Sequence, residues 1–355
     1  MTYFLRDILR QPELQRTLDF LLGTGRAGLD AAAASIRGAR HVYLTGIGSS
    51  WHAALSAATL FNLEARPVYL YDAAELLEFA NFPANSVAII ISRSGRSIEI
   101  VKLLAKFRER GATVIAITNV AEGTLAQNAQ IPIVVPVALD HAISVNTYST
   151  LAAAAGILAS VTSATWSTEL ATALSASFSE TIPAITGWQA QVADSPWLEP
   201  GAVTYFLARG CSLGSCQEAR LLWEEGVKSS ASAMGTGSFR HGPQEMVKAG
   251  QRFGMWIDGA RMRVQDLAVA RDLRRLGASV MLIGRDLPQD AGDLTFQLPD
   301  LPNDWQFLID LIPTQLAAEK LARLSGVDSD TFRYCSFIVE DEFGILPRPS
   351  NSSIR

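Results

Sequence analysis

The residues that could do chemistry include two serine-rich turns, each of which directly follows an apolar run typical of a buried strand. The first turn carries Ser49 and Ser50. The second turn carries Ser92, Arg93, Ser94 and Ser97. Hydroxyl groups, free backbone amides and a glycine that permits close approach form a neutral cradle for a phosphate monoester. Serines also commonly cap helices, but two clusters at neighbouring strand ends favour a phosphate site, to which Arg93 could add charge.

A glutamate and a histidine further along the chain could move protons. By 3.6-residue periodicity, one helix face carries Glu218, Leu221, Leu222 and Glu225. Desolvation on this partly apolar stripe would raise the pKa of Glu225 toward that of a useful general base. His241 lies in the glycine-bounded loop "GTGSFRHGP". A loop histidine taken alone is more often structural, but its occurrence beside such a glutamate and a phosphate cradle favours acid/base function.

The elements that must position these residues repeat along the chain. Gly48 and Gly210 each end an apolar strand before a helix, and they lie 162 positions apart. Gly111 and Gly277 each separate a basic helix end from an apolar strand, 166 positions apart. Because continuous apolar strands alternate with amphipathic helices, the pattern predicts an α/β fold with two tandem doubly wound domains, each a parallel sheet flanked by helices. The predicted divisions are an N-terminal helical segment at residues 1–27, a phosphate-binding domain at 28–165, a domain with the glutamate and histidine at 196–335, and a tail at 336–355.

The second unit does not repeat the phosphate cradle. At the 166-residue offset, Ser94 corresponds to Ala260 and Gly95 to Arg261, which predicts one phosphate site per chain. Nucleotide motifs are weak: no GxxxxGK[ST] occurs, and Trp51 stands where "GIGSSW" would need the third glycine of a dinucleotide fingerprint.

Composition excludes several other classes of protein. The chain has 355 residues, of which 48% are hydrophobic and 18% charged, so it is globular. Its net charge of -5 argues against nucleic acid and an anionic membrane surface as partners. The N-terminus has no clear secretory pattern and the three cysteines lack metal-type spacing, so we expect a reducing cytoplasm and no metal. Residues 141–168 carry no Asp, Glu, Lys or Arg, but Ser, Thr and Asn interrupt them, so we expect a buried helix and no membrane span.

The whole chain, from "FLRDILRQP" to "SFIVEDE", resembles the sugar isomerase (SIS) family with two domains, which includes the isomerase half of glucosamine-6-phosphate synthase. The motifs that carry the resemblance are "GIGSS", "SRSGRS", "ISVNTYST" and "RHGP". The resemblance implies phosphate contacts from Ser50, Ser92, Arg93, Ser94 and Ser97, with Ser49 adjacent, and a sugar contact from Ser144. It implies that Glu225 moves a proton between C1 and C2, and that His241 assists ring opening or leaving-group protonation. In the synthase that histidine comes from a neighbouring subunit, which implies a homodimer; no cofactor is implied.

Departures from the synthase pattern indicate the subtype. No glutamine-hydrolysing domain is found, Cys335 stands at the position of the lysine that forms a Schiff base, and Leu222 replaces a second lysine. The resemblance therefore implies an aldose–ketose isomerising enzyme that releases amine from an aminated or amino-acid-conjugated sugar 6-phosphate, as a deaminase or deglycase. The alternatives are a glutamine-independent, synthase-like isomerase and a non-catalytic sugar-phosphate sensor.

Overall fold

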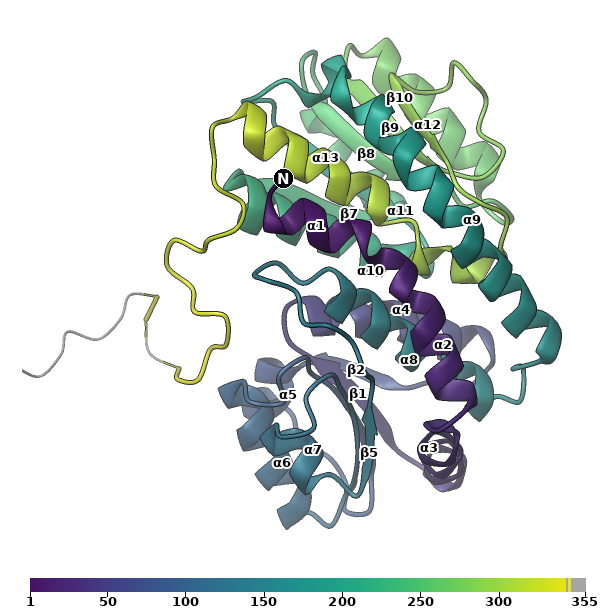
Figure 1. Ribbon diagram of the computed structural model, residues 1–355, viewed down its shortest axis with the longest axis vertical. Helices are drawn as coiled ribbons and strands as arrows, with labels where there is room; N and C mark the ends of the chain where they lie inside the picture. Colours follow the sequence, from purple (N-terminus) through teal and green to yellow (C-terminus); the bar gives the residue numbers. More distant parts are fainter. Residues whose placement is uncertain (343, 346–355) are drawn as a thin grey trace, which may run out of the picture.

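The computed structural model describes residues 1–342, 344 and 345, so most of the tail predicted at 336–355 lies outside the described residues. Two five-stranded parallel sheets, each flanked by helices, lie one above the other (Figure 1). This arrangement confirms the predicted fold class of two tandem doubly wound α/β units. The exact domain boundaries remain a prediction.

The first sheet has the strand order β2-β1-β3-β4-β5. Its strands are β1 (Val42–Gly46), β2 (Tyr69–Asp72), β3 (Val87–Ile91), β4 (Thr113–Thr118) and β5 (Ile131–Val134). Around it lie α3 (Arg26–Gly38), α4 (Ser49–Leu63), α5 (Ala73–Phe79), α6 (Ile98–Glu109) and α7 (Thr124–Asn128). Every residue of β1 and β3 is buried, because helices cover both faces of the parallel sheet.

The second sheet has the order β10-β9-β8-β6-β7. When this order is read from β7 and β6 is counted as the first strand of its unit, it is the same 2-1-3-4-5 order as in the first sheet. Its strands are β6 (Thr204–Ala208), β7 (Ala231–Gly235), β8 (Arg252–Trp256), β9 (Ser279–Gly284) and β10 (Leu294–Gln297), with helices α10 (Ser212–Leu222), α11 (Thr236–Phe239) and α12 (Arg263–Arg275). The repeated glycines have matching backbones: φ is +56° at both Gly48 and Gly210, and +67° and +83° at Gly111 and Gly277. Glycine favours these positions because positive φ strains other residues.

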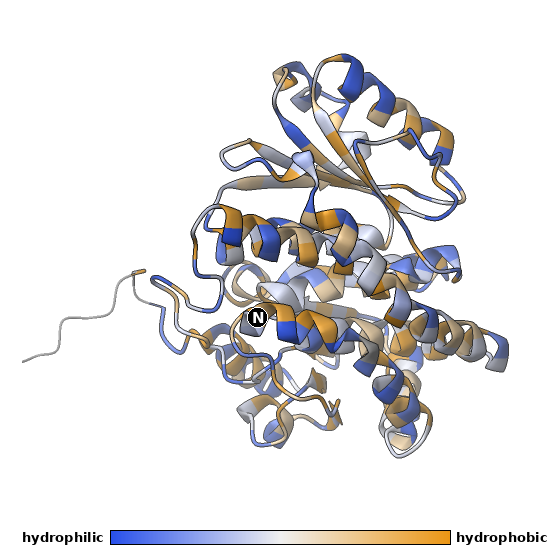
Figure 2. Cartoon of the chain, turned by 45° about the horizontal axis from the view of Figure 1, so that its top comes forward, coloured by the Kyte–Doolittle hydropathy of each residue, from blue (hydrophilic) through white to orange (hydrophobic). Residues whose placement is uncertain are grey.

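Further helices connect and support the two units. They are α1 (Tyr3–Leu9), α2 (Leu14–Leu22), α8 (Asn146–Thr162), α9 (Thr168–Ala193) and α13 (Ile312–Leu324). All 17 residues of α8, which occupies most of the uncharged stretch, are buried. In Figure 2 the outer helices carry hydrophilic residues on one face and hydrophobic residues on the other. Within the described residues, no helix combines the length and apolar character that a membrane span requires.

The two units pack through α4 and α10 with approximate two-fold symmetry. Ser49 Oγ donates to Glu218 Oε1 over 2.9 Å, and Ser56 Oγ donates to the Cys211 carbonyl over 2.7 Å. The repeat offset of 162 positions relates Ser49 to Cys211 and Ser56 to Glu218, so each contact is the counterpart of the other. A Cβ added at Gly214 would lie 2.2 Å from Ser56 Oγ, so the helices approach too closely there for any other residue. Each unit therefore presents the helix after its first strand, α4 or α10, to the other unit.

Candidate functional site

A cavity of about 220 Å³ lies at the carboxyl edge of the first sheet, between β1 and β3. The strand order reverses direction at this point, which is where open α/β sheets bind ligands. Helices α4 and α6 begin there, and the first amides of a helix lack partners within the helix. The structure brings together here the predicted site residues Ser49, Ser50, Ser92, Arg93, Ser94, Ser97, Ser144 and Glu225.

The second serine turn is held by its own backbone. Ser92 Oγ accepts from the Gly95 amide over 3.1 Å, and Ser94 Oγ accepts from the Arg96 amide over 3.2 Å. These bonds occupy an oxygen lone pair and leave each hydroxyl proton available to a ligand. Gly95 has φ +64°, and a Cβ there would lie 3.0 Å from Leu125 Cβ. The turn is therefore rigid and still able to donate to an anion.

Arg93 connects three parts of the cavity wall. One terminal nitrogen donates to Ser144 Oγ over 3.2 Å, and the other donates to the Phe337 carbonyl over 2.7 Å. None of the ion pairs found among the described residues includes Arg93. Its positive charge is thus not bound to a described carboxylate, and its contact with phosphate remains a prediction.

Ser49 makes a contact that sequence reasoning missed. Its hydroxyl donates to Glu218, which is only 1% exposed, and His52 Nδ1 lies 2.6 Å from the other carboxylate oxygen. The hydroxyl proton of Ser49 is therefore engaged by Glu218, although the residue lines the cavity. The helical spacing of Ser49 and His52 places them on one face, but the sequence does not show their shared partner, because Glu218 lies 166 positions beyond His52.

Glu225 lies in a π-helical turn, Trp223–Val227, that directly follows α10. Burial, followed by the negative charge of Glu218, raises its pKa to about 7, against the opposing charges of Arg93 and Lys228. A carboxyl group with this pKa exchanges its proton readily near neutral pH, as a general base must.

The helix face around Glu225 differs from the predicted one. Periodicity placed Leu221 and Leu222 on the same face as Glu225. In the structure Leu221 lines the cavity, whereas Leu222 is fully buried in the core. A π-turn holds an additional residue and so changes which side chains share a face.

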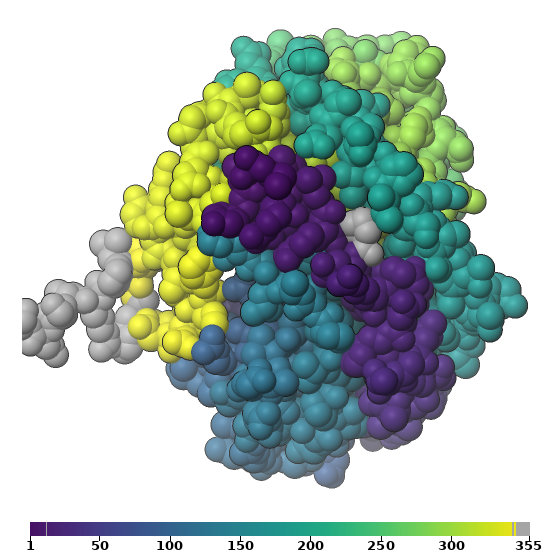
Figure 3. All heavy atoms as spheres, in the orientation of Figure 1, coloured from purple at the N-terminus to yellow at the C-terminus, as the bar shows by residue number. Residues whose placement is uncertain are grey.

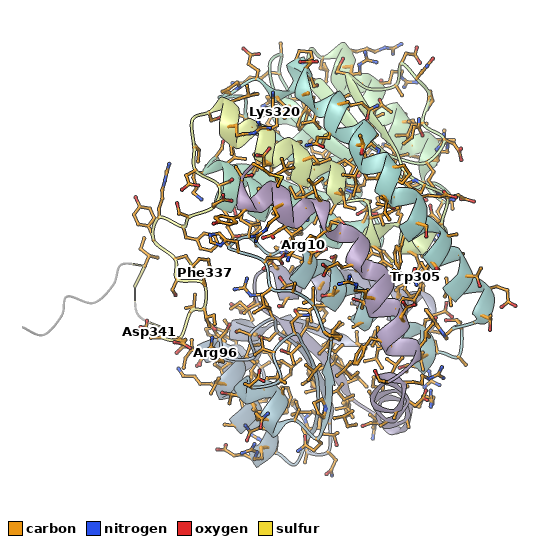
Figure 4. All side chains as sticks on the ribbon, viewed as in Figure 1. Arg10, Arg96, Trp305, Lys320, Phe337 and Asp341 are labelled. Atoms are coloured by element: carbon orange, nitrogen blue, oxygen red, sulfur yellow. The ribbon has the colours of Figure 1, made fainter. Side chains whose placement is uncertain are left out.

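The C-terminal segment after α13 covers the cavity. It runs from the upper unit down against the lower unit in Figure 3, and Figure 4 labels Phe337 on it, on the same side of the molecule as Arg96. The Val339 carbonyl accepts from the Ile98 amide, at the start of α6, over 3.0 Å. Lys102 forms an ion pair with Glu342. These bonds hold the segment across the mouth of the predicted phosphate cradle.

Cys335 lies on this segment and lines the cavity with Glu225. Partial burial, followed by the negative charge of Glu225, raises the pKa of its thiol. The group is therefore a protonated thiol at neutral pH and a poor nucleophile.

His241 is the one predicted site residue that lies outside the cavity. It follows α11, is exposed, and does not line the cavity within this chain. Its role and the homodimer that would bring it to a site remain predictions.

The corresponding edge of the second sheet is occupied by the protein's own carboxylates. Asp258 Oδ1 accepts from the amides of Ala260 and Arg261, over 2.7 Å each. Arg209 forms an ion pair with the buried Asp266 over 2.7 Å. A carboxylate thus accepts from the turn amides here, whereas serine hydroxyls do so at the first sheet. That each chain has one phosphate site remains a prediction.

Comparisons with known proteins agree with this architecture. Residues 35–162 match the SIS domain family. The chain is 25% identical over 339 residues to a glutamine–fructose-6-phosphate aminotransferase (isomerizing) of Pyrobaculum aerophilum, which covers 92% of this chain and 56% of the relative. A relative of the same description from Aeropyrum pernix is 26% identical over 350 residues, covering 92% and 55%. The chain thus spans about half the length of the curated relatives it matches.

Solved structures share the fold along nearly the whole chain. A glucosamine-6-phosphate deaminase from Thermotoga maritima superposes with a TM-score of 0.81 at 22% identity, covering 95% of this chain and 99% of that one. The C-terminal domain of a glucosamine-fructose-6-phosphate aminotransferase from Francisella tularensis gives a TM-score of 0.82 at 19% identity, covering 93% and 98%. Residues 35–162 thus match the SIS domain family, and they lie within a fold of two tandem α/β units that these solved structures share.

Proposed function

We propose that the protein is a sugar-phosphate enzyme of isomerase type, which transfers a proton between C1 and C2 of an aminated or amino-acid-conjugated sugar 6-phosphate and releases the amine. The observation that carries this proposal is one cavity that combines a serine cradle at two helix N-termini with a carboxyl group of pKa about 7. Relatives and structural neighbours named as aminotransferases, a deaminase and isomerases support the same chemistry.

The substrate's phosphate is bound by the hydroxyls of Ser92, Ser94 and Ser97, with Arg93 adding positive charge. Glu225 removes the proton on the carbon next to the carbonyl group, and the electron pair of that C–H bond forms a C1–C2 double bond. The same carboxyl group returns the proton to the other carbon, which converts the amine into an imine. Water then adds to the imine carbon, and the amine leaves after protonation, for which we propose His241 of a neighbouring subunit.

The synthase alternative is disfavoured by two side chains. Cys335 occupies the position of the imine-forming lysine, and a thiol cannot form an imine. Leu222, at the second lysine position, is fully buried and cannot reach the cavity.

The test is a screen of purified protein against ketose and aldose 6-phosphates that carry an amino group or an amino acid, with hexose phosphate and free amine both measured. We expect turnover that Glu225→Gln lowers about 100-fold or more while substrate still binds, because glutamine cannot accept the carbon-bound proton. Glu180→Gln, an exposed change of the same kind on α9, is the matched control. Binding without turnover of any compound would refute the enzyme proposal and leave a sensor.

A further inference from the structure

A second cavity, of about 350 Å³, adjoins the first on the far side of the proposed base. Glu225, Phe332 and Cys335 line both cavities. Lys228 and Arg333 line only the second one. A ligand that extended from the phosphate cradle past Glu225 would enter this second space.

The second cavity carries cations without carboxylate partners. Lys228 Nζ donates to the carbonyls of Glu225 and Thr331, the latter over 2.8 Å, which leaves one of its three protons free. Among the described residues, neither Lys228 nor Arg333 appears in any ion pair.

Glu224 and Glu225 also line this cavity, and Asp328 lies near Lys228. Glu224 pairs with Arg220 over 2.7 Å. The carboxylate of Asp328 accepts from the Asp330 amide and from Thr331 Oγ1, over 2.8 Å each. Two positive charges therefore face this cavity with no described carboxylate bound to either.

The backbone holds Lys228 in place. It ends the π-turn with φ +56°, a left-handed conformation, so its side chain leaves the helix in a fixed direction beside Glu225. Its ammonium group lies 5.7 Å from the centre of the Phe332 ring, and burial followed by the charge of Arg333 lowers its pKa. The negative charges of Glu225 and Asp328 oppose this effect, and an anionic ligand bound between Lys228 and Arg333 would remove their mutual repulsion.

We propose that this second cavity is the subsite for the leaving amine, and that the amine carries a carboxylate bound by Lys228 and Arg333. This inference rests on the proposed function and narrows its substrate class to amino-acid conjugates of ketose 6-phosphates. Released ammonia would need no such space and no cations.

The reaction at such a substrate balances without a further reagent. Glu225 takes a proton from C1, which bears the amino acid, and the C2 carbonyl becomes an enol. Protonation at C2 then places the double bond between C1 and nitrogen. Water adds to C1, the C1–N bond breaks, and the products are an aldose 6-phosphate and the free amino acid.

Two matched substrates test this subsite: fructose 6-phosphate joined at C1 to glycine, and the same sugar joined to methylamine, which lacks only the carboxylate. The measurement is kcat/KM for release of aldose 6-phosphate. We expect wild type to prefer the glycine conjugate by roughly 10- to 100-fold, the range for hydrogen bonds to a charged group. Arg333→Gln should reduce this preference, mainly through KM, and Arg333→Lys should restore part of it. Arg275→Gln, an exposed change on α12, is the control and should leave the preference unchanged.

The outcomes separate the two proposals. Equal turnover of both conjugates, or a preference that Arg333→Gln does not alter, would overturn the subsite and leave the proposed function intact. Turnover of glucosamine 6-phosphate without turnover of either conjugate would likewise overturn the subsite in favour of ammonia release. Failure to turn over any sugar phosphate would instead refute the proposed function.

Discussion

Removing the charge of Glu218 should shift the pH dependence of catalysis toward acid. Glu218 is the charge that most raises the pKa of Glu225, after burial. A base must be ionised to accept a proton, so activity should rise with pH through about 7 in the wild type. Glu218→Gln keeps the size of the side chain and removes its charge, and the Glu225 pKa should fall.

The size of this pKa shift follows from the spacing of Glu218 and Glu225 along the helix. Residues seven apart on a helix are separated by about 10 Å along its axis, at about 1.5 Å per residue. At an effective dielectric constant of about 20, two unit charges at that distance interact by about 1.6 kcal/mol. Since one pKa unit corresponds to about 1.36 kcal/mol, the acidic limb should move down by about one pH unit. It should not return to the ordinary glutamate range, because burial, the larger cause, remains.

The assay is kcat/KM from about pH 5 to 9 for wild type and Glu218→Gln, with circular dichroism to show that the fold persists without the contacts to Ser49 and His52. Glu224→Gln is the matched comparison: Glu224 also raises the Glu225 pKa, but it is the smallest of the causes, so its removal should give a smaller shift in the same direction. An acidic limb that stays in place or moves toward alkaline pH in Glu218→Gln would refute this account of the base.

Four further outcomes are expected. Ser94→Ala should weaken phosphate-ester binding by roughly 1–3 kcal/mol in calorimetry without unfolding the chain, and unchanged affinity would reduce the serine to a turn former. Gly214→Ala should cost about 1–3 kcal/mol in denaturant unfolding, because its Cβ would overlap Ser56; a neutral change would show that α4 and α10 separate easily. Folding raises the Glu225 pKa from the ordinary glutamate value to about 7, so the folded state loses stability as pH rises through that window. Glu225→Gln should therefore raise the melting temperature more at pH 8 than at pH 5. If a neighbouring subunit supplies His241, mixing Glu225→Gln with His241→Ala should restore part of the activity once subunit exchange is shown, whereas full activity of either single variant would remove that residue from catalysis.

The sequence predicted the fold because parallel sheets leave a strong pattern. Strands buried on both faces appear as continuous apolar runs, and turns with positive φ favour glycine, so Gly48 and Gly210 mark equivalent points 162 residues apart. The same regularity places the serine turns together, because turns that follow adjacent parallel strands meet at one edge of the sheet. The local sequence pattern and the order of the strands were therefore sufficient to predict that the two serine turns lie together.

The parts that could not be predicted depend on contacts between distant segments. The bond between His52 and Glu218 joins two helices from different units, and a single sequence does not show which buried polar groups will meet. The π-turn that begins directly after the buried Leu222 is a one-residue irregularity that helical periodicity does not reveal. The hydrogen bond from the Ile98 amide to the Val339 carbonyl joins residues 241 positions apart. It depends on the position at which the chain leaves α13.

The approximate symmetry also shows how the second sheet edge differs from the first within the described residues. Each unit offers a turn at its own sheet edge and a helix end to the edge of the other unit, so the π-turn after α10, which carries Glu225, serves the proposed cradle of the first sheet. The offset of 162 places Leu63, at the end of α4, as the counterpart of Glu225. At the second edge Asp258 occupies the turn amides, so the proposed base and the proposed cradle are both replaced there. A base without the cradle would have no means of holding the substrate's phosphate. A cradle without the base would bind the phosphate but could not move the proton, so catalysis needs both at one edge.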